Sequence, residues 1–348
     1  MKAFFAREQL LHDQSVEFNR GELTAPYESG KRAEMLFSAL EAAFPGAARD
    51  AAEFPVSHLL DIHDADYIGF LQSAFGEWVA EGRTGDAFPM VWPVHDMRGE
   101  KIPNTIVGKI SHYSFEISTA ITKHSWISAR RSAETALSGA QELSRGANMA
   151  FSLCRPPGHH AGRGYFGGYC YLNNAGIAAQ YLRNEGASRI AILDVDYHHG
   201  NGTQQIFYDR DDVFYVSVHA DPDTDFPYFL GYADETGAGK GEGFNLNIPL
   251  SRGAAWPSYG EALSHALNRI GDYAPDALIV SLGVDTSAGD PLSGFLLTRD
   301  DFARMGVAIA ALQRQTLFVF EGGYAINDVG GNVVSVLNGF LGAAHSTP

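Results

Sequence analysis

The sequence predicts an α/β fold: a single-domain, open, mostly parallel β-sheet with helices on both of its faces. Two observations predict it. Short, almost wholly apolar runs recur along the 348-residue chain, and longer segments with helical periodicity lie between them. Near-continuous apolar strands are typical of a parallel sheet, because the connecting helices bury both of its faces. No repeat of fixed period and no low-complexity linker divides the chain, so one domain is expected over 1–348.

Each strand is predicted from a short run of apolar, β-branched and aromatic residues. The predicted strands are KAFF (2–5), MAFSLC (149–154), RIAILDV (189–195), VFYVSV (213–218), ALIVSL (277–282) and LFVFE (317–321). Each helix is predicted from apolar residues that recur with helical spacing. The predicted helices span 30–44, 127–146, 173–186, 258–273, 298–315 and 326–341.

Two long segments show no regular pattern. Residues 83–112 combine Pro, Gly and mixed charges, and residues 220–243 follow a predicted strand without any clear periodicity. A long irregular segment inside a compact domain is usually functional or a subunit contact. We therefore treat about 83–112 as an irregular insertion within the domain.

Composition excludes several classes of function. A formal net charge of −16 argues against nucleic acid as a partner and suits cationic small molecules, although many acidic proteins have no such ligand. The two cysteines form no disulfide framework, which indicates a reducing compartment. No signal peptide and no long apolar stretch is evident, so no membrane association and a cytoplasmic location are expected.

Ionisable side chains follow four of the predicted strands, where a buried core would not place them. In a parallel α/β sheet, ligands bind at the carboxyl ends of the strands. The four strand ends supply, in chain order, His159 and His160; Asp194, Asp196, His198 and His199; Asp285; and Tyr324. These side chains should therefore meet at one edge of the sheet.

The first pattern in this group is that of a metal site. Asp196 and His198 are two residues apart and share one face of an extended segment, and Asp285 can complete the set from another strand. Asp, His and Asp with an open position is the ligand set of a catalytic zinc site, and the two carboxylates would neutralise the ion. In the alternative reading, the aspartates cap the next element and the histidines are core donors, which requires several independent coincidences.

Taken together, the motifs resemble a known family, and the similarity runs from about residue 20 to 340. The segments that carry it are CRPPGHHAG (154–162), FGGYCYLNNAGIAA (166–179), RIAILDVDYHHGNGTQQIFY (189–208), VSVH (216–219), LIVSLGVDT (278–286) and FEGGY (320–324). They resemble the arginase-deacetylase fold of the histone deacetylase superfamily, and more closely its bacterial acetylpolyamine amidohydrolases.

The resemblance implies a role for each matching side chain. Asp196, His198 and Asp285 match the ligands of one catalytic zinc ion per chain, with iron as the other metal to consider in the cell. His160 matches the general base that later protonates the leaving amine, and His159 matches the histidine that stabilises charge.

The same resemblance assigns the residues around these groups. Asp194 matches the carboxylate that orients His159, Asn201 matches the partner of His160, and Tyr324 matches the phenol that hydrogen-bonds the scissile carbonyl. Tyr169 and Phe226 match the aromatic walls of the substrate channel, with Gly168 beside them, and Arg32 matches the arginine of the acetate channel. A structural potassium ion is implied at Asp194, Asp196, His198, Ser217 and Val218.

The resemblance implies a zinc-dependent amidohydrolase that cleaves small N-acylated amines, with acetylpolyamines as the default substrates. Val107 and Ser118 stand where carboxylates for a distal ammonium are expected, and Glu116 or Asp96 is the candidate replacement. Asn19 and Ser287 replace aromatic residues that are usual in this branch. The alternatives are therefore an amidase for small neutral N-alkyl amides and an acetyl-lysine deacetylase.

Two readings of a different class remain. A non-catalytic binding protein of the same fold predicts a damaged site, whereas every expected group is present. A binuclear manganese hydrolase predicts further carboxylate ligands, where this chain has His159 and Tyr324. By resemblance, the 83–112 segment is also the expected contact of a homodimer or higher homo-oligomer that narrows the entrance to the site.

Overall fold

An eight-stranded sheet forms the centre of the protein. The structure is a computed structural model and describes residues 1–19 and 21–344. Residues 345–348 of the predicted domain lie outside the described residues. All strand pairs of this sheet within the described residues are parallel, and the α/β fold class is confirmed. The strand order is β4 (Ala48–Asp50), β1 (Lys2–Phe5), β5 (Met149–Ser152), β10 (Gln315–Phe320), β9 (Ala277–Leu282), β6 (Ile190–Asp194), β7 (Val213–Ala220) and β8 (Asn245–Leu250).

The six predicted strands are all present, and the sequence reasoning missed the strands at the two edges of the sheet. Strand β4 has only three residues, two of them charged and exposed. Strand β8 turns Asn245 and Asn247 inward, so its buried positions are amides rather than apolar side chains. Edge strands pair on one side only, and neither strand carries the apolar run on which the prediction depended.

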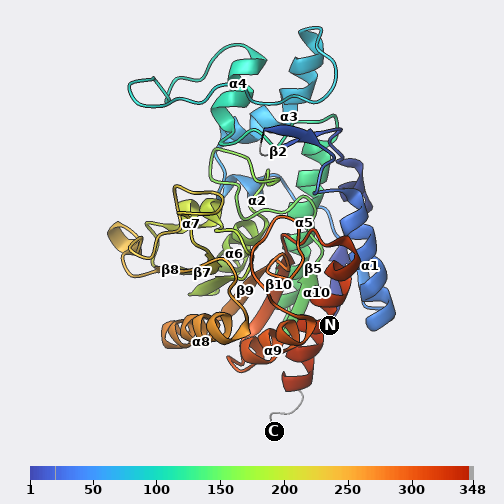
Figure 1. Cartoon of the computed structure of the whole chain (residues 1–348), viewed down its shortest axis with the longest axis vertical. Helices are drawn as coiled ribbons and strands as arrows, with labels where there is room; N and C mark the ends of the chain where they lie inside the picture. Colours follow the sequence, from blue (N-terminus) through green and yellow to red (C-terminus); the bar gives the residue numbers. More distant parts are fainter. Residues whose placement is uncertain (20, 345–348) are drawn as a thin grey trace.

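Helices cover both faces of the sheet, as predicted (Figure 1). One face packs against α1 (Gly30–Ala43), α8 (Trp256–Tyr273), α9 (Arg299–Ala310) and α10 (Ile326–Ala344). The opposite face packs against α5 (Ser125–Ser144) and α6 (Asn174–Asn184), and its apolar cluster extends into α2 (Ser57–Leu60), α3 (Ala65–Ala80), α4 (Ile106–Tyr113) and α7 (Asn201–Phe207).

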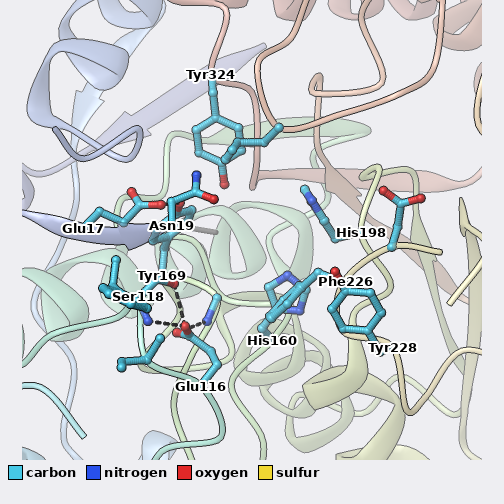
Figure 2. A pocket seen from close by; sticks show the side chains of 15 residues that line it. Glu17, Asn19, Glu116, Ser118, His160, Tyr169, His198, Phe226, Tyr228 and Tyr324 are labelled. Atoms are coloured by element: carbon cyan, nitrogen blue, oxygen red, sulfur yellow. Dashed lines mark hydrogen bonds between the residues drawn. The ribbon is translucent and has the colours of Figure 1, made fainter. Parts of the chain in front are cut away.

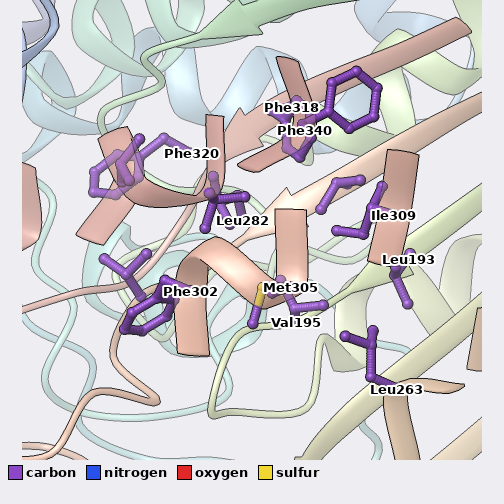
Figure 3. Close-up of a cluster of buried hydrophobic side chains, with 14 of the residues drawn as sticks. Leu193, Val195, Leu263, Leu282, Phe302, Met305, Ile309, Phe318, Phe320 and Phe340 are labelled. Atoms are coloured by element: carbon purple, nitrogen blue, oxygen red, sulfur yellow. The ribbon is translucent and has the colours of Figure 1, made fainter. Parts of the chain in front are cut away.

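The core follows the alternation of side chains along each strand. Leu193 and Val195 face the layer of α8 to α10, whereas Ile190 and Ile192 face the layer of α5 and α6. Figure 3 shows side chains of the first of these layers, among them Leu193, Val195 and Met305 of α9. Burial on both faces explains why the strands read as continuous apolar runs.

Two sequence predictions are corrected by the structure. The helix predicted over 298–315 ends at Ala310, because Gln313 has a φ of 53° and β10 begins at Gln315. The irregular segment 83–112 contains the start of α4 at Ile106.

Several elements lie away from the sheet. The strands β2 (Glu17–Asn19) and β3 (Glu22–Thr24) form an antiparallel hairpin, which lies with α3 and α4 at the top of Figure 1. Two short 3₁₀ turns, Arg7–Leu11 and Gly239–Gly241, complete the described elements. Among the described residues, no helix combines the length and the apolar character that crossing a membrane requires.

Candidate active site

A pocket of about 390 Å³ opens at the carboxyl ends of the central strands, with further walls from the β2–β3 hairpin and two loops (Figure 2). Figure 2 shows Glu17, Asn19, Ser118 and Glu116 on one side of this pocket, and His160, His198, Phe226 and Tyr228 on the other. The other lining residues are Phe18, Ile117, Gly168, Tyr169, Asp225, Leu292 and Tyr324.

Asp196, His198 and Asp285 form a cluster at the floor of this pocket, where His198 lines the pocket and the two aspartates are fully buried next to it. Their nearest ligand atoms all lie within 4.8 Å of one another. His198 Nδ1 lies 3.0 Å from Asp285 Oδ2 and 3.3 Å from Asp196 Oδ1. Backbone N–H groups orient both carboxylates, since Gly322 donates to Asp196 at 2.8 Å and Tyr197 donates to Asp285 at 2.9 Å.

The chemistry of these three donors fits a divalent cation. Both carboxylates are fully buried, and burial together with the neighbouring charge of Asp196 raises the pKa of Asp285 to about 7. Two buried carboxylates so close together are costly without a compensating charge. One imidazole and two carboxylates at a pocket floor match the three-ligand set of a catalytic zinc site.

His159 is held between two buried carboxylates. Its Nδ1 lies 3.1 Å from Asp194 Oδ2, and its Nε2 lies 3.8 Å from Asp196 Oδ1. The hydroxyl of Tyr215 donates to the same Asp194 oxygen at 3.0 Å. Burial alone lowers the pKa of His159, but Asp196 and Asp194 together raise it to about 10. This arrangement favours the imidazolium form of His159.

The adjacent His160 has the opposite environment. Its Nδ1 lies 2.7 Å from Asn201 Oδ1, while Asn201 Nδ2 donates to the hydroxyl of Tyr165 at 3.2 Å. Asn201 Oδ1 is thus the acceptor, so Nδ1 of His160 carries the proton and Nε2 is free to accept one. Burial and the neighbouring His159 and His198 lower the pKa of His160 well below its ordinary value. His160 is therefore neutral and basic at Nε2.

Gly168 allows the wall of the pocket to approach His160. A Cβ atom at this position would lie 2.3 Å from His160 Cδ2, and its φ of +55° lies in the left-handed region. Both constraints favour glycine. On either side of this contact, Tyr169 lies 5.7 Å from the Tyr324 ring and Phe226 lies 5.1 Å from the His160 ring, between ring centroids. The predicted channel residues Gly168, Tyr169 and Phe226 thus all line the pocket.

Tyr324 lies in the loop after β10, and Arg32 supports this loop from α1. The guanidinium of Arg32 donates to the carbonyl oxygens of Gly323 and Glu321, each at 2.7 Å, and to Glu28 at 2.8 Å. Its carbon Cζ lies 4.6 Å from the centre of the Tyr324 ring. Arg32 is fully buried.

The residues predicted to hold potassium lie on β6, β7 and the loop after β6. Asp194 is the register partner of Ser217, and Val218 follows in β7. Asp196 and His198 come directly after β6. The Ser217 hydroxyl lies 2.7 Å from Nδ1 of His219.

The residues predicted to affect specificity are dispersed. Val107 lies on α4 and lines a separate groove with Met90 and Met97, whereas Asn19 and Ser118 line the pocket. Asp96 is exposed and does not line the pocket. Ser287 is buried away from it and accepts a hydrogen bond from Asn332 at 3.1 Å.

Glu116 lines the pocket, but its carboxylate already binds the surrounding backbone. It accepts from the N–H groups of Gly168 and Thr119, each at 3.0 Å, and from both the N–H and the hydroxyl of Ser118. Four donors on one carboxylate fix the loop and leave little capacity for a ligand. Glu116 therefore stabilises the loop around it, a role that the sequence did not indicate.

Sequence reasoning missed several residues of the site. Glu17, Asp225, Tyr228 and Leu292 line the pocket from the hairpin and loops, where no periodicity indicates which side chains face a ligand. Glu321 belongs to the FEGGY motif, which predicted no role for it. Its carboxylate accepts from the N–H groups of Gly158 at 2.6 Å and His159 at 3.2 Å, so it orients the tandem histidines. The sequence offered one signal for this role, because Glu321 directly precedes Gly322 at the end of a predicted strand.

Comparison with known proteins agrees with this geometry. Residues 26–340 match the histone deacetylase domain. The chain is 48% identical over 342 residues to acetylpolyamine amidohydrolase 2 of Pseudomonas aeruginosa, covering 98% of this chain and 99% of the relative. It is 45% identical to the acetylpolyamine amidohydrolase of Mycoplana ramosa, covering 98% of this chain and 100% of the relative.

A solved structure extends the agreement to three dimensions. The crystal structure of acetylpolyamine aminohydrolase from Burkholderia pseudomallei superposes with a TM-score of 0.94 at 38% identity, covering 99% of each chain. The match of the domain and of the relatives spans nearly the whole chain and includes every strand end described above. The chain therefore belongs to the histone deacetylase family and is a hydrolytic deacetylase.

Proposed function

We propose that this deacetylase is a zinc-dependent amidohydrolase that removes the acetyl group from acetylpolyamines. The observation that carries the proposal is a single pocket whose floor can hold a metal ion and whose other side carries a carboxylate. Its floor combines the three metal-ligand candidates with two histidines whose pKa values their surroundings shift in opposite directions. Its other side carries the carboxylate of Glu17. The relatives named acetylpolyamine amidohydrolase support the same substrate class.

Asp196, His198 and Asp285 would hold the metal ion. When bound, zinc lowers the pKa of water toward ~7 and polarises a carbonyl group. The residues of the chain perform the proton transfers. Neutral His160 accepts a proton from the attacking water at Nε2, which its bond to Asn201 leaves free, and then delivers it to the departing nitrogen.

His159 and Tyr324 stabilise the negative charge that develops on the carbonyl oxygen. The carboxylate of Asp194, 3.1 Å from Nδ1, favours the protonated form of His159, which can therefore contribute positive charge. Burial raises the pKa of Tyr324 well above its ordinary value, so the phenol keeps its proton and can donate it in a hydrogen bond. Donors held in place before reaction are the main source of such stabilisation.

The substrate class follows from the charge on the other side of the pocket. Glu17 accepts hydrogen bonds from the hydroxyl of Tyr169 at 2.7 Å and from the N–H of Tyr27 at 3.1 Å. Burial raises the pKa of Glu17, the two hydrogen bonds lower it, and the nearby Glu116 and Glu28 raise it again. None of the largest contributions to this shift comes from a cation. An ammonium group on the substrate would supply the missing positive charge.

A second candidate is an amidase for small neutral amides, and the uncharged side chains of Asn19 and Ser118 favour it. A third is an acetyl-lysine deacetylase. A panel of acetylputrescine, N-butylacetamide and an acetyl-lysine peptide separates the three. We expect the highest kcat/KM on acetylputrescine. Equal values for acetylputrescine and N-butylacetamide would exclude a preference for polyamines.

Metal analysis tests the cofactor independently of the substrate. We expect about one zinc ion per chain. Iron in its place would preserve the ligand set, whereas two manganese ions per chain would contradict the proposal. We also propose a structural potassium ion at Asp194, Ser217 and Val218, together with Asp196 and His198, tested by the stability of the protein in potassium and in tetramethylammonium salts.

We further propose that the protein is a cytoplasmic homodimer or higher homo-oligomer. Met90, Val91, Val94 and Met97 of the irregular segment are each more than half exposed, at 57–68%. Apolar side chains gathered in this way mark contact surfaces. Both cysteines are buried and free, which suits a reducing compartment. Light scattering of Met90→Glu/Met97→Glu tests the contact, and an unchanged oligomer would contradict it.

A further inference from the structure

Asp290 lies in the loop after β9 and has no role in the chemistry described above. Its side chain is 94% buried, with an exposed fraction of 6%. One carboxylate oxygen, Oδ2, accepts from the N–H of Tyr324 at 2.6 Å and from the N–H of Ala325 at 3.1 Å. The other oxygen, Oδ1, accepts from the N–H of Leu292 at 3.0 Å. One carboxylate thus joins its own loop to the loop after β10.

Both of these loops contribute a residue to the pocket. Leu292 and Tyr324 line it, and each is bound through its own backbone N–H to Asp290. Charge-assisted hydrogen bonds of this kind are stronger than neutral ones. Asp290 therefore ties the backbone of Tyr324 to the backbone of Leu292.

The loop that carries Tyr324 depends on such anchors because its own backbone is permissive. Gly322 and Gly323 precede the tyrosine, and Gly323 has a φ of +139°, in the region that favours glycine. Arg32 binds the carbonyl oxygens of Glu321 and Gly323. Asp290 binds the N–H groups that follow, so the loop is held through carbonyls on one side and through amides on the other.

We propose that Asp290 is a positioning residue that sets the Tyr324 hydroxyl for catalysis through the backbone of Tyr324. This inference rests on the proposed role of Tyr324 as a hydrogen-bond donor to the scissile carbonyl. It predicts that Asp290 acts on the rate only when the Tyr324 hydroxyl is present. A residue that merely stabilises the fold would affect the rate regardless of that hydroxyl.

Asp301 provides a matched control. The residue is also 6% exposed, and its carboxylate also binds the chain locally, accepting from the N–H and the hydroxyl of Thr298 at 2.9 and 2.7 Å. It caps the start of α9 and does not line the pocket. Asp301→Asn thus removes a similarly buried anchor without touching the loop of Tyr324.

The experiment is a double-mutant cycle on the metal-loaded protein with the best amide of the substrate panel. Asp290→Asn keeps the shape of the side chain but places N–H groups where an acceptor is needed. We expect it to lower kcat about 10- to 100-fold, with a much smaller change in KM, because a small displacement of a catalytic group has an effect of this size. We expect Asp301→Asn to leave kcat within about twofold, and Asp290→Asn to lower kcat no further in a Tyr324→Phe background.

Three outcomes would overturn the inference. The first is an equal loss in both backgrounds, and the second is no loss at all. The third is that Asp290→Asn and Asp290→Ser both fail to fold while Asp301→Asn folds, which would assign Asp290 to folding. A Tyr324→Phe variant with the full wild-type rate would refute the proposed role of Tyr324 as well, so the two failures are distinguishable.

Discussion

The floor and the mouth of the pocket are built differently. The floor, defined as His159, His160, Asp196, His198 and Asp285, stands on the ends of parallel strands and on the turns directly after them. The mouth, defined as Glu17, Asn19, Ile117, Ser118 and Tyr228, stands on the β2–β3 hairpin and on two loops. The floor is almost wholly buried, whereas Tyr228 at the mouth is 49% exposed.

This difference assigns separate tasks to the two regions. At the floor, each carboxylate is oriented by a backbone N–H group, as Asp196 is by Gly322, and the geometry is fixed by the sheet. At the mouth, side chains meet the solvent and can change without disturbing the sheet. Changes at the floor should therefore affect every substrate, and changes at the mouth should affect only some.

The largest effect is expected from loss of a metal ligand at the floor. Asp285→Ala removes one of the two carboxylates and leaves His198 without its nearer partner, at 3.0 Å. We expect metal retention to fail and kcat/KM to fall more than about 10³-fold for all substrates, because the activated water is lost. Metal analysis and the substrate panel measure this, with Asp301→Asn as the control. Full zinc content in the variant would contradict the ligand assignment.

Tyr324→Phe should have the next largest effect. It removes one hydrogen-bond donor without touching the metal ligands, so zinc should remain bound while kcat falls about 10²- to 10³-fold. Zinc content and single-turnover rates on acetylputrescine separate the two properties. A rate within a few-fold of the wild type would show that the hydroxyl does not bind the reacting oxygen.

The gathering of the floor residues was also predicted from the sequence. Asp196, His198, Asp285 and the two tandem histidines were identified because ionisable groups directly after apolar strands are conspicuous, and a parallel sheet gathers such positions at one edge. The strand runs that made this possible are the six that were predicted and found.

The mouth could not be predicted in the same way. Val107 was expected beside the substrate, but α4 directs it into a separate groove with Met90 and Met97. Glu116 was a candidate ligand for ammonium, but it accepts hydrogen bonds from its own loop and from Gly168. Nothing in local spacing reveals either outcome, because loops bring residues together through long-range contacts rather than through a periodic pattern.

Asn201→Asp tests how the floor sets the protonation of His160. A carboxylate 2.7 Å from Nδ1 would stabilise the imidazolium and raise the pKa of His160, which is otherwise lowered well below 6.5. Since the base must be neutral to accept a proton, the acid limb of kcat/KM should move to higher pH, by about 1 to 2 units. The variant should thus lose about 10-fold or more at a pH one unit below its new limb.

The pH profile of kcat/KM between about pH 5 and 8 measures this shift around the ordinary histidine value. Zinc content at each pH serves as the control, because protons also compete with the metal for its ligands. Superimposable acid limbs for the wild type and the variant would show that His160 is not the group whose protonation limits the rate.

The smallest effect is expected at the mouth, where Glu17→Gln removes a charge but keeps its shape. The amide oxygen of Gln still accepts the hydrogen bond that Tyr169 donates to Glu17 at 2.7 Å, so the wall formed by Tyr169 should stay in place, whereas the bond from the N–H of Tyr27 at 3.1 Å is lost. We expect kcat/KM on acetylputrescine to fall about 10-fold, or ~1.4 kcal/mol, through a higher KM. N-Butylacetamide, which has a similar length and no ammonium, should be cleaved at an unchanged rate. A loss shared equally by both substrates would mean that Glu17 supports the wall through Tyr169, and the separation of floor from mouth would fail at this residue.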